Sequence, residues 1–135
     1  MPVVRRDWVL RWLALYENAW RTPGTVALAE LFTPTVTYLA SPWSEPVRGL
    51  DELALMWEAE RADGEEFTMS SEVLAVDADT AVVRVDVDYE RPEPSLWRNL
   101  WVVRFAAGGR CAAFEEWPFA PGQYDGHAAP EEPAR

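Results

Sequence analysis

Hydrophobic residues recur at helical spacing near the start of the chain and at alternate positions over its second half. Four aromatic residues follow one another at intervals of four: Trp8, Trp12, Tyr16 and Trp20. This spacing places them on one face of a helix, which we predict over about residues 7–20, ended by Pro23-Gly24. Such a stripe belongs either to a buried core or to a ligand pocket, and core is the commoner use.

Two further helices are predicted from the same periodicity, over about residues 25–32 and 50–62. Between them, residues 35–39 are β-branched and aromatic, which indicates a short strand. Residues 41–46, with two prolines and two serines, are predicted as a loop.

After Gly64 the hydrophobic period changes from about 3.6 to 2, which indicates strands. We predict four long ones, over about residues 66–76, 80–90, 96–106 and 110–119. Their short connections imply hairpins, and hairpins join antiparallel neighbours. The order of helices first and strands last predicts an α+β fold. We expect one domain over residues 1–120 and a flexible tail over residues 121–135.

Charge and composition narrow the chemistry. The 135 residues carry a net charge of −11, which does not favour nucleic-acid binding. All 12 cations are Arg, so lysine Schiff-base chemistry is excluded within this sequence. The single histidine, His127, falls in the tail, and a metal site in the core is not expected. The single Cys111 and the lack of a membrane span or signal pattern predict a cytoplasmic protein that does not enter a membrane.

Three segments carry a resemblance to a known family. Residues 31–38, Leu-Phe-Thr-Pro-Thr-Val-Thr-Tyr, look like a segment common in SnoaL-like proteins of the NTF2-like superfamily. Residues 46–53 resemble the start of the family's third helix, and residues 109–117 resemble its terminal strand. The resemblance covers about residues 7–120. It implies a curved antiparallel sheet wrapped around three N-terminal helices as a cone, with an apolar pocket for a small molecule and no cofactor.

The string Val83-Arg84-Val85-Asp86-Val87 alternates strictly, so its charged and apolar residues face opposite sides of a strand. The charged row either faces solvent or points into the cone. The second reading rests on resemblance to limonene epoxide hydrolase, whose matching strand also contains Arg-Val-Asp-Val. That resemblance assigns Arg84 and Asp86 as catalytic, with Tyr38 and, near the second acid, Glu116. Ala40 stands where that enzyme has an Asn.

Ketosteroid isomerase provides a second comparison, which fits less well. Tyr16 has the spacing of that enzyme's oxyanion-hole tyrosine. The general-base Asp would fall near Ala40 or Ser41, and the second acid near Trp101, and none of these residues can replace an acid. Tyr16 therefore stays a candidate pocket hydroxyl, while steroid isomerisation is not implied.

The candidate ligand-binding residues are Tyr16, Trp57, Asn99 and Trp101. Asn99 lies between Trp97 and Trp101 on one predicted strand face, where it either binds a ligand or is satisfied by the backbone. Glu115 and Glu116 are adjacent, so only one of them can face a pocket.

Two classes of function follow. The first is a SnoaL-like enzyme that performs cofactor-free acid–base chemistry on an apolar oxygenated molecule, as cyclase, hydrolase, isomerase or dehydratase. The second is a non-catalytic NTF2-like module for ligand binding or dimerisation. In both cases we expect a homodimer, because both rows of the predicted strands contain large apolar residues.

Overall fold

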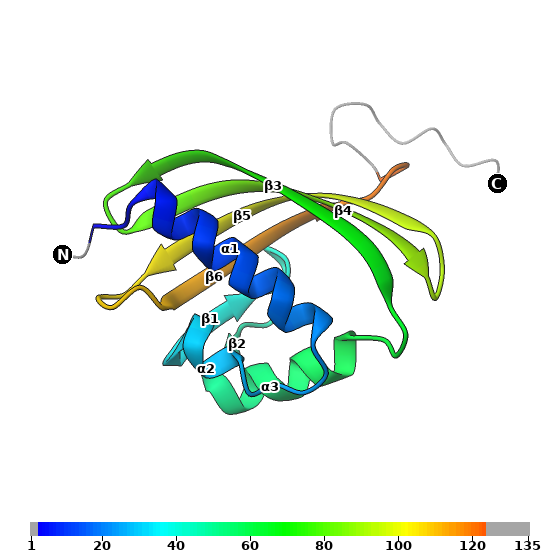
Figure 1. Ribbon diagram of the computed structural model, residues 1–135, viewed down its shortest axis with the longest axis horizontal. Helices are drawn as coiled ribbons and strands as arrows, with labels where there is room; N and C mark the ends of the chain where they lie inside the picture. Colours follow the sequence, from blue (N-terminus) through cyan, green and yellow to red (C-terminus); the bar gives the residue numbers. More distant parts are fainter. Residues whose placement is uncertain (1–2, 124–135) are drawn as a thin grey trace.

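The computed structural model describes residues 3–123, and a curved six-stranded sheet dominates it (Figure 1). The helices are α1 (Arg6–Arg21), α2 (Leu28–Leu31) and α3 (Gly49–Glu60). The strands are β1 (Phe32–Leu39), β2 (Val47–Arg48), β3 (Glu66–Asp77), β4 (Thr80–Arg91), β5 (Ser95–Phe105) and β6 (Cys111–Phe119). Helix α1 crosses the concave side of the arched sheet, and α3 lies beside β1 and β2. The α+β cone predicted from the sequence is confirmed.

The strand order is β2-β1-β6-β5-β4-β3. Strands β3 to β6 form an antiparallel meander, as their hairpin connections predict. One pair departs from the predicted antiparallel sheet, because β1 runs parallel to β6. No hairpin signal predicts this pair, because α3 and the four strands β2 to β5 lie between its members in the chain. The two-residue strand β2 pairs with β1 in a segment for which no strand was predicted.

The second helix is shorter than predicted: it begins at Leu28 rather than at about residue 25, and it ends at Leu31 because β1 begins at Phe32 rather than at residue 35. Phe32 is fully buried and pairs with Cys111 of β6. This tertiary packing places Phe32 in a strand, although the sequence predicted it as the last residue of the helix. The other long elements match the predicted ranges to within about two residues.

The core lies between α1 and the sheet. Trp12 is fully buried, donates its indole N–H to the Leu31 carbonyl at 2.9 Å and meets Phe32 and Phe105 edge to face. Trp8 donates to the Gly109 carbonyl at 2.8 Å and so ties the start of α1 to the β5–β6 turn. Part of the aromatic stripe is therefore core, as its commoner use predicts.

Within residues 3–123, no helix is both long and apolar enough to cross a membrane. Residues 124–135, and with them His127 and most of the expected tail, lie outside the described residues.

Candidate active site in the concave pocket

A pocket of about 350 Å³ lies between the concave face of the sheet, α1 and α3. This volume is typical of sites for small organic molecules. Aromatic and thioether side chains form most of its wall: Trp20, Met56, Phe67, Met69, Tyr89 and Trp97. These flat, polarisable surfaces suit a planar apolar ligand.

Polar side chains interrupt this apolar wall, and five of them come from α1 and the strands β1, β5 and β6: Tyr16, Tyr38, Asn99, Trp101 and Glu116. Glu60 of α3 and Tyr89 of β4 also line the pocket. The pairing of β5 with β6 places Trp101 directly opposite Glu116 and Asn99 opposite Pro118. Because Asn99 and Trp101 are two residues apart on one strand, both enter the pocket beside Glu116. Ala40, which follows β1, also lines this region.

Glu116 is the acid whose environment differs most from water. Burial raises the pKa of its carboxyl from an ordinary 4.5 to about 7. The indole N–H of Trp101 approaches the carboxyl and opposes part of this rise, but the geometry between them falls short of a hydrogen bond. Among the described residues, none of those that line the pocket is an Arg, Lys or His that would keep Glu116 ionised. Both protonation states of Glu116 are therefore populated near neutral pH.

Tyr16 and Tyr38 form a buried hydroxyl pair, with 3.1 Å between their oxygens. Both rings stack on Phe114, at interplanar angles of 9° and 10°, which fixes the two hydroxyls side by side. Burial raises the pKa of each tyrosine above its ordinary value, so both stay protonated. Only one hydroxyl hydrogen is used between them, which leaves the second free to donate to a ligand.

The phase of β6 decides between the two adjacent glutamates. Phe114 and Glu116 face the pocket side, whereas Glu115 accepts a hydrogen bond from Trp117 Nε1 at 2.6 Å on the opposite face. Of the two candidates, Glu116 is therefore the one inside.

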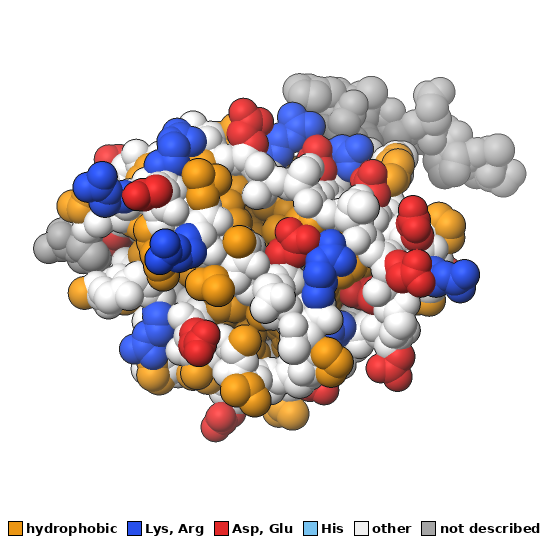
Figure 2. Space-filling model, in the orientation of Figure 1, with side chains coloured by type: hydrophobic (Ala, Val, Ile, Leu, Met, Phe, Trp, Pro, Cys, Tyr) orange, Lys and Arg blue, Asp and Glu red, His pale blue; other side chains and the backbone are white. Residues whose placement is uncertain are grey.

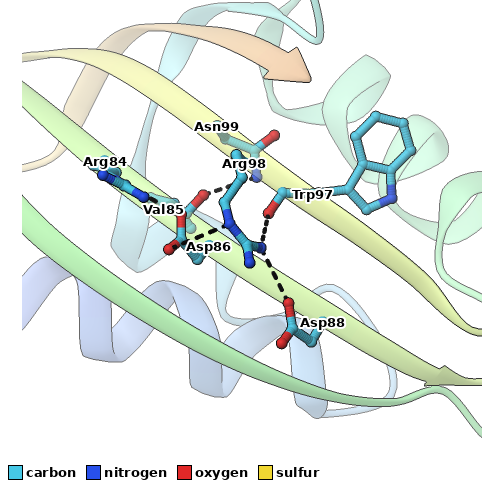
Figure 3. Close-up of polar contacts among 7 residues, drawn as sticks. All are labelled: Arg84, Val85, Asp86, Asp88, Trp97, Arg98 and Asn99. Carbon is cyan, nitrogen blue, oxygen red and sulfur yellow. Dashed lines mark hydrogen bonds and ion pairs between the residues drawn. The ribbon is translucent and has the colours of Figure 1, made fainter. Parts of the chain in front are cut away.

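The expected placement of Arg84 and Asp86 in the pocket is wrong. The valines beside them, Val83 and Val85, are fully buried in the core, so strand alternation puts the charged row on the convex face. There Arg84 and Arg98 contact Asp86 at 3.4 and 3.6 Å, and Arg98 contacts Asp88 at 3.2 Å (Figure 3). Solvent around this network removes the desolvation cost that the same charges would meet inside the cone.

Trp57 was expected to bind a ligand but does not line the pocket. It is fully buried behind Tyr16 and Trp20, with ring centroids 5.2 and 4.7 Å away. It therefore supports the pocket wall from the core side.

Several wall residues were not predicted from the sequence as ligand-binding, among them Tyr89, Trp97 and Met69. Tyr89 and Val87 lie on the apolar row of the alternating string in β4, so the same pattern could have identified them once its phase was known. No comparable signal marks Met56 or Met69, because an apolar residue lining a pocket looks like one in a core.

Within residues 3–123, no group of three or more His, Cys, Asp or Glu is arranged to hold a metal ion. Figure 2 shows acidic and basic side chains interspersed over the face seen in Figure 1. The described residues on this face form no continuous basic patch of the kind that binds nucleic acid.

A curved, mostly antiparallel sheet with helices on its concave side, enclosing an aromatic pocket, is the architecture of the NTF2-like cone. The SnoaL-like domain family matches residues 12–114, and the chain belongs to it. No curated protein matches the sequence.

Solved structures share the fold at low identity. A candidate isomerase of the SnoaL-like family from Agrobacterium tumefaciens is 15% identical with a TM-score of 0.69, over 84% of this chain and 99% of that one. A candidate polyketide cyclase from Sinorhizobium meliloti is 22% identical with a TM-score of 0.61, over 78% and 93%. An epoxide hydrolase of the limonene type from M. tuberculosis is 12% identical with a TM-score of 0.66, over 84% of each chain. At these identities the similarity establishes the fold alone.

Proposed function

We propose that this protein is a cofactor-free acid–base enzyme that acts on a small, apolar, oxygenated molecule, with Glu116 as the residue that transfers the proton. One observation carries the proposal: a half-buried carboxyl group lies in an apolar pocket beside two tyrosine hydroxyls, with no cation among the residues 3–123 that line it. Such surroundings favour a group that exchanges protons near neutral pH over one that merely binds charge.

The roles of the residues follow from their chemistry. Ionised Glu116 would take a proton from a carbon or from water, and protonated Glu116 would return it to a second position of the same molecule. The free hydroxyl hydrogen of the Tyr16–Tyr38 pair would stabilise an oxygen on which negative charge develops. Cyclase, isomerase, hydrolase and dehydratase reactions all use these two functions, and the substrate decides among them.

A non-catalytic ligand-binding module is the second candidate. It is favoured by the placement of Arg84 and Asp86 on the convex face, which leaves Glu116 without the paired acid and base of the hydrolase arrangement. The two candidates differ in whether Glu116 removes a proton from a bound molecule.

A general proton-transfer probe tests this difference without knowledge of the substrate. 5-Nitrobenzisoxazole is planar and apolar, and a base that removes its ring C–H proton opens the ring to a coloured cyanophenolate. We expect catalysis above the buffer rate, rising with pH and with an apparent pKa of about 7, that of Glu116. Glu116→Gln should abolish it, whereas Glu115→Gln, on the opposite face of β6, should not.

The contrary results are equally specific. If Glu116→Gln and the parent protein open the ring at the same rate, Glu116 is not a base in this pocket, and the binding module becomes the better description. If Glu115→Gln lowers the rate as much as Glu116→Gln, the effect belongs to overall charge.

We also propose a homodimer that forms through the convex face of β5 and β6. Three large apolar side chains on this face are well exposed in the single chain: Leu96, Trp117 and Phe119. Apolar sheet surface of this kind is commonly covered by a second copy.

A further inference from the structure

Two buried polar atoms on β5 have no hydrogen-bond partner among the described residues. Asn99 is 6% exposed and Trp101 is 3% exposed, and both line the pocket. The unpartnered atoms are Asn99 Oδ1, an acceptor, and Trp101 Nε1, a donor. Buried polar groups left unpaired cost about 1–3 kcal/mol each, so a pair of them in one pocket points to a ligand that satisfies both.

The orientation of the Asn99 amide is fixed by the neighbouring strand. Its Nδ2 donates to the Val85 carbonyl of β4 at 3.1 Å (Figure 3). The reversed amide would place two oxygens against each other and lose this bond. The free atom of Asn99 is therefore the acceptor, and a ligand must bring a donor to meet it.

The two unpartnered atoms lie on neighbouring inward positions of one strand. Residues two apart on a strand are separated by about 6–7 Å, and their side chains stand on the same face. A hydroxyl group suits this arrangement, since it donates one hydrogen bond and accepts another at a single oxygen. A carbonyl or ether oxygen would leave Asn99 Oδ1 unpaired.

Charge excludes another group of ligands. Glu116 lies opposite Trp101, and Glu60 also lines the pocket, while no basic residue within 3–123 lines it. A carboxylate or phosphate at this position would face carboxyl and amide oxygens with no cation to offset the repulsion. Aromatic walls from Trp20, Trp97 and Phe67 favour a flat ring system.

We propose that Asn99 and Trp101 select the ligand: the pocket binds a neutral, planar ring system with a free hydroxyl that donates to Asn99 Oδ1 and accepts from Trp101 Nε1. This inference rests on the pocket of the proposed function as the ligand site, but not on proton transfer by Glu116. A phenol or an enol of a ring ketone has the required chemistry.

Three naphthalenes with different substituents test the selection by calorimetric titration at about pH 6, where most of Glu116 is protonated. 2-Naphthol donates and accepts, 2-methoxynaphthalene only accepts, and 2-naphthoate is an anion. We expect the parent protein to bind 2-naphthol at least about tenfold more tightly than 2-methoxynaphthalene, the ratio that one lost hydrogen bond to a buried acceptor produces. 2-Naphthoate should bind more weakly still.

The variants are compared by the ratio of the two affinities within each protein, so that a general loss of stability cancels. Asn99→Leu removes the acceptor and should bring the ratio of 2-naphthol to 2-methoxynaphthalene close to one. Trp101→Phe removes the donor together with part of the aromatic surface, and the ratio of the two affinities separates these effects. It should weaken 2-naphthol while leaving a preference for it, and it provides a second test if Asn99→Leu does not fold. Leu100→Val, between them but facing outward, is the matched control and should keep the parent ratio.

Equal binding of 2-naphthol and 2-methoxynaphthalene by the parent protein would overturn the proposal, as would binding of neither. A preference that persists unchanged in Asn99→Leu would also overturn it, because the added methyl group alone would then explain the difference. Repeating the titration in Glu116→Gln separates the two proposals. If this variant keeps the naphthol preference while the proton-transfer test fails, the selection by Asn99 and Trp101 stands and the catalytic role of Glu116 does not.

Discussion

Trp101 and Glu116 stand directly opposite each other on β5 and β6, and both side chains enter the same apolar pocket. The pairing brings a half-buried acid next to a buried indole N–H without forming a hydrogen bond between them. The indole N–H offsets only part of the desolvation of the acid, so the pKa of Glu116 stays raised to about 7. The same pairing leaves the Trp101 donor available to a ligand.

The first prediction concerns the dependence of stability on pH. Folding raises the pKa of Glu116 from 4.5 to about 7, so the folded chain holds this proton more tightly than the unfolded chain does. The contribution of this proton to stability is complete below the pKa of Glu116 in the unfolded chain, and it is lost as the pH rises through about 7. Glu116→Gln cannot ionise, and at about pH 9 we expect it to be more stable than the parent by up to about 3 kcal/mol. Urea unfolding at about pH 5 and pH 9 measures the difference, which should shrink at the lower pH.

Glu115→Gln is the control for this prediction, because it removes the same formal charge from the outer face of β6. If both substitutions stabilise the protein equally at the higher pH, relief of the net charge of −11 is the cause instead.

The second prediction concerns the charged network on the convex face. Asp86 contacts Arg84 and Arg98 at 3.4 and 3.6 Å, at partly exposed positions where ion pairs contribute little. Asp86→Asn should change the free energy of unfolding by less than about 1 kcal/mol and leave the opening of 5-nitrobenzisoxazole unaltered. If Asp86→Asn lost that activity while the protein stayed folded, Asp86 would have the hydrolase-like catalytic role that its position on the convex face argues against.

Alternation along β4 was visible in the sequence, but its phase was not. The string from Val83 to Asp88 defines two faces and does not say which one meets α1. Burial of Val83 and Val85 settles the phase, and this depends on residues of other elements packing against them. For the same reason the sequence could name Glu115 and Glu116 as alternatives without choosing between them.

The elements themselves were predictable because their signals are local. Hairpin turns such as the one at residues 77–79 fix the antiparallel meander of β3 to β6. The parallel pairing of β1 with β6 joins segments more than 70 residues apart, as in Phe32 with Cys111, and no local pattern encodes it. The site depends on this non-local pair, because Tyr38 of β1 reaches the pocket only through it.

The third prediction concerns the contact between α1 and the β5–β6 turn. A Cβ added at Gly109 would lie 2.9 Å from Trp8 Cε2, and Trp8 is held there by its bond to the Gly109 carbonyl. Gly108 has a similar positive φ, 94° against 89°, but a Cβ there meets nothing within 4 Å. Gly108→Ala should therefore lower the free energy of unfolding by about 1–2 kcal/mol, the cost of a positive φ at a residue with a Cβ. Gly109→Ala should lower the free energy of unfolding by at least about 1 kcal/mol more than Gly108→Ala does, because Trp8 must move.

Urea unfolding of the two variants side by side measures this difference. If they are equally destabilised, Trp8 gives way without cost, and its contact with Gly109 does not anchor the start of α1.

The last prediction tests the homodimer through a pair of exposed tryptophans. Trp117 is 39% exposed on the convex face, close in register to Leu100 of β5, whereas Trp43 is 96% exposed in the loop after β1. A stable interface buries about 800 Å² on each partner, and an arginine at its centre would leave a charge without solvent. Trp117→Arg should therefore convert a dimer into a monomer, while Trp43→Arg should leave it intact. Sedimentation equilibrium at micromolar concentrations distinguishes these masses, and a monomeric parent protein would show that the apolar strip of β5 and β6 is not a contact between copies of this chain.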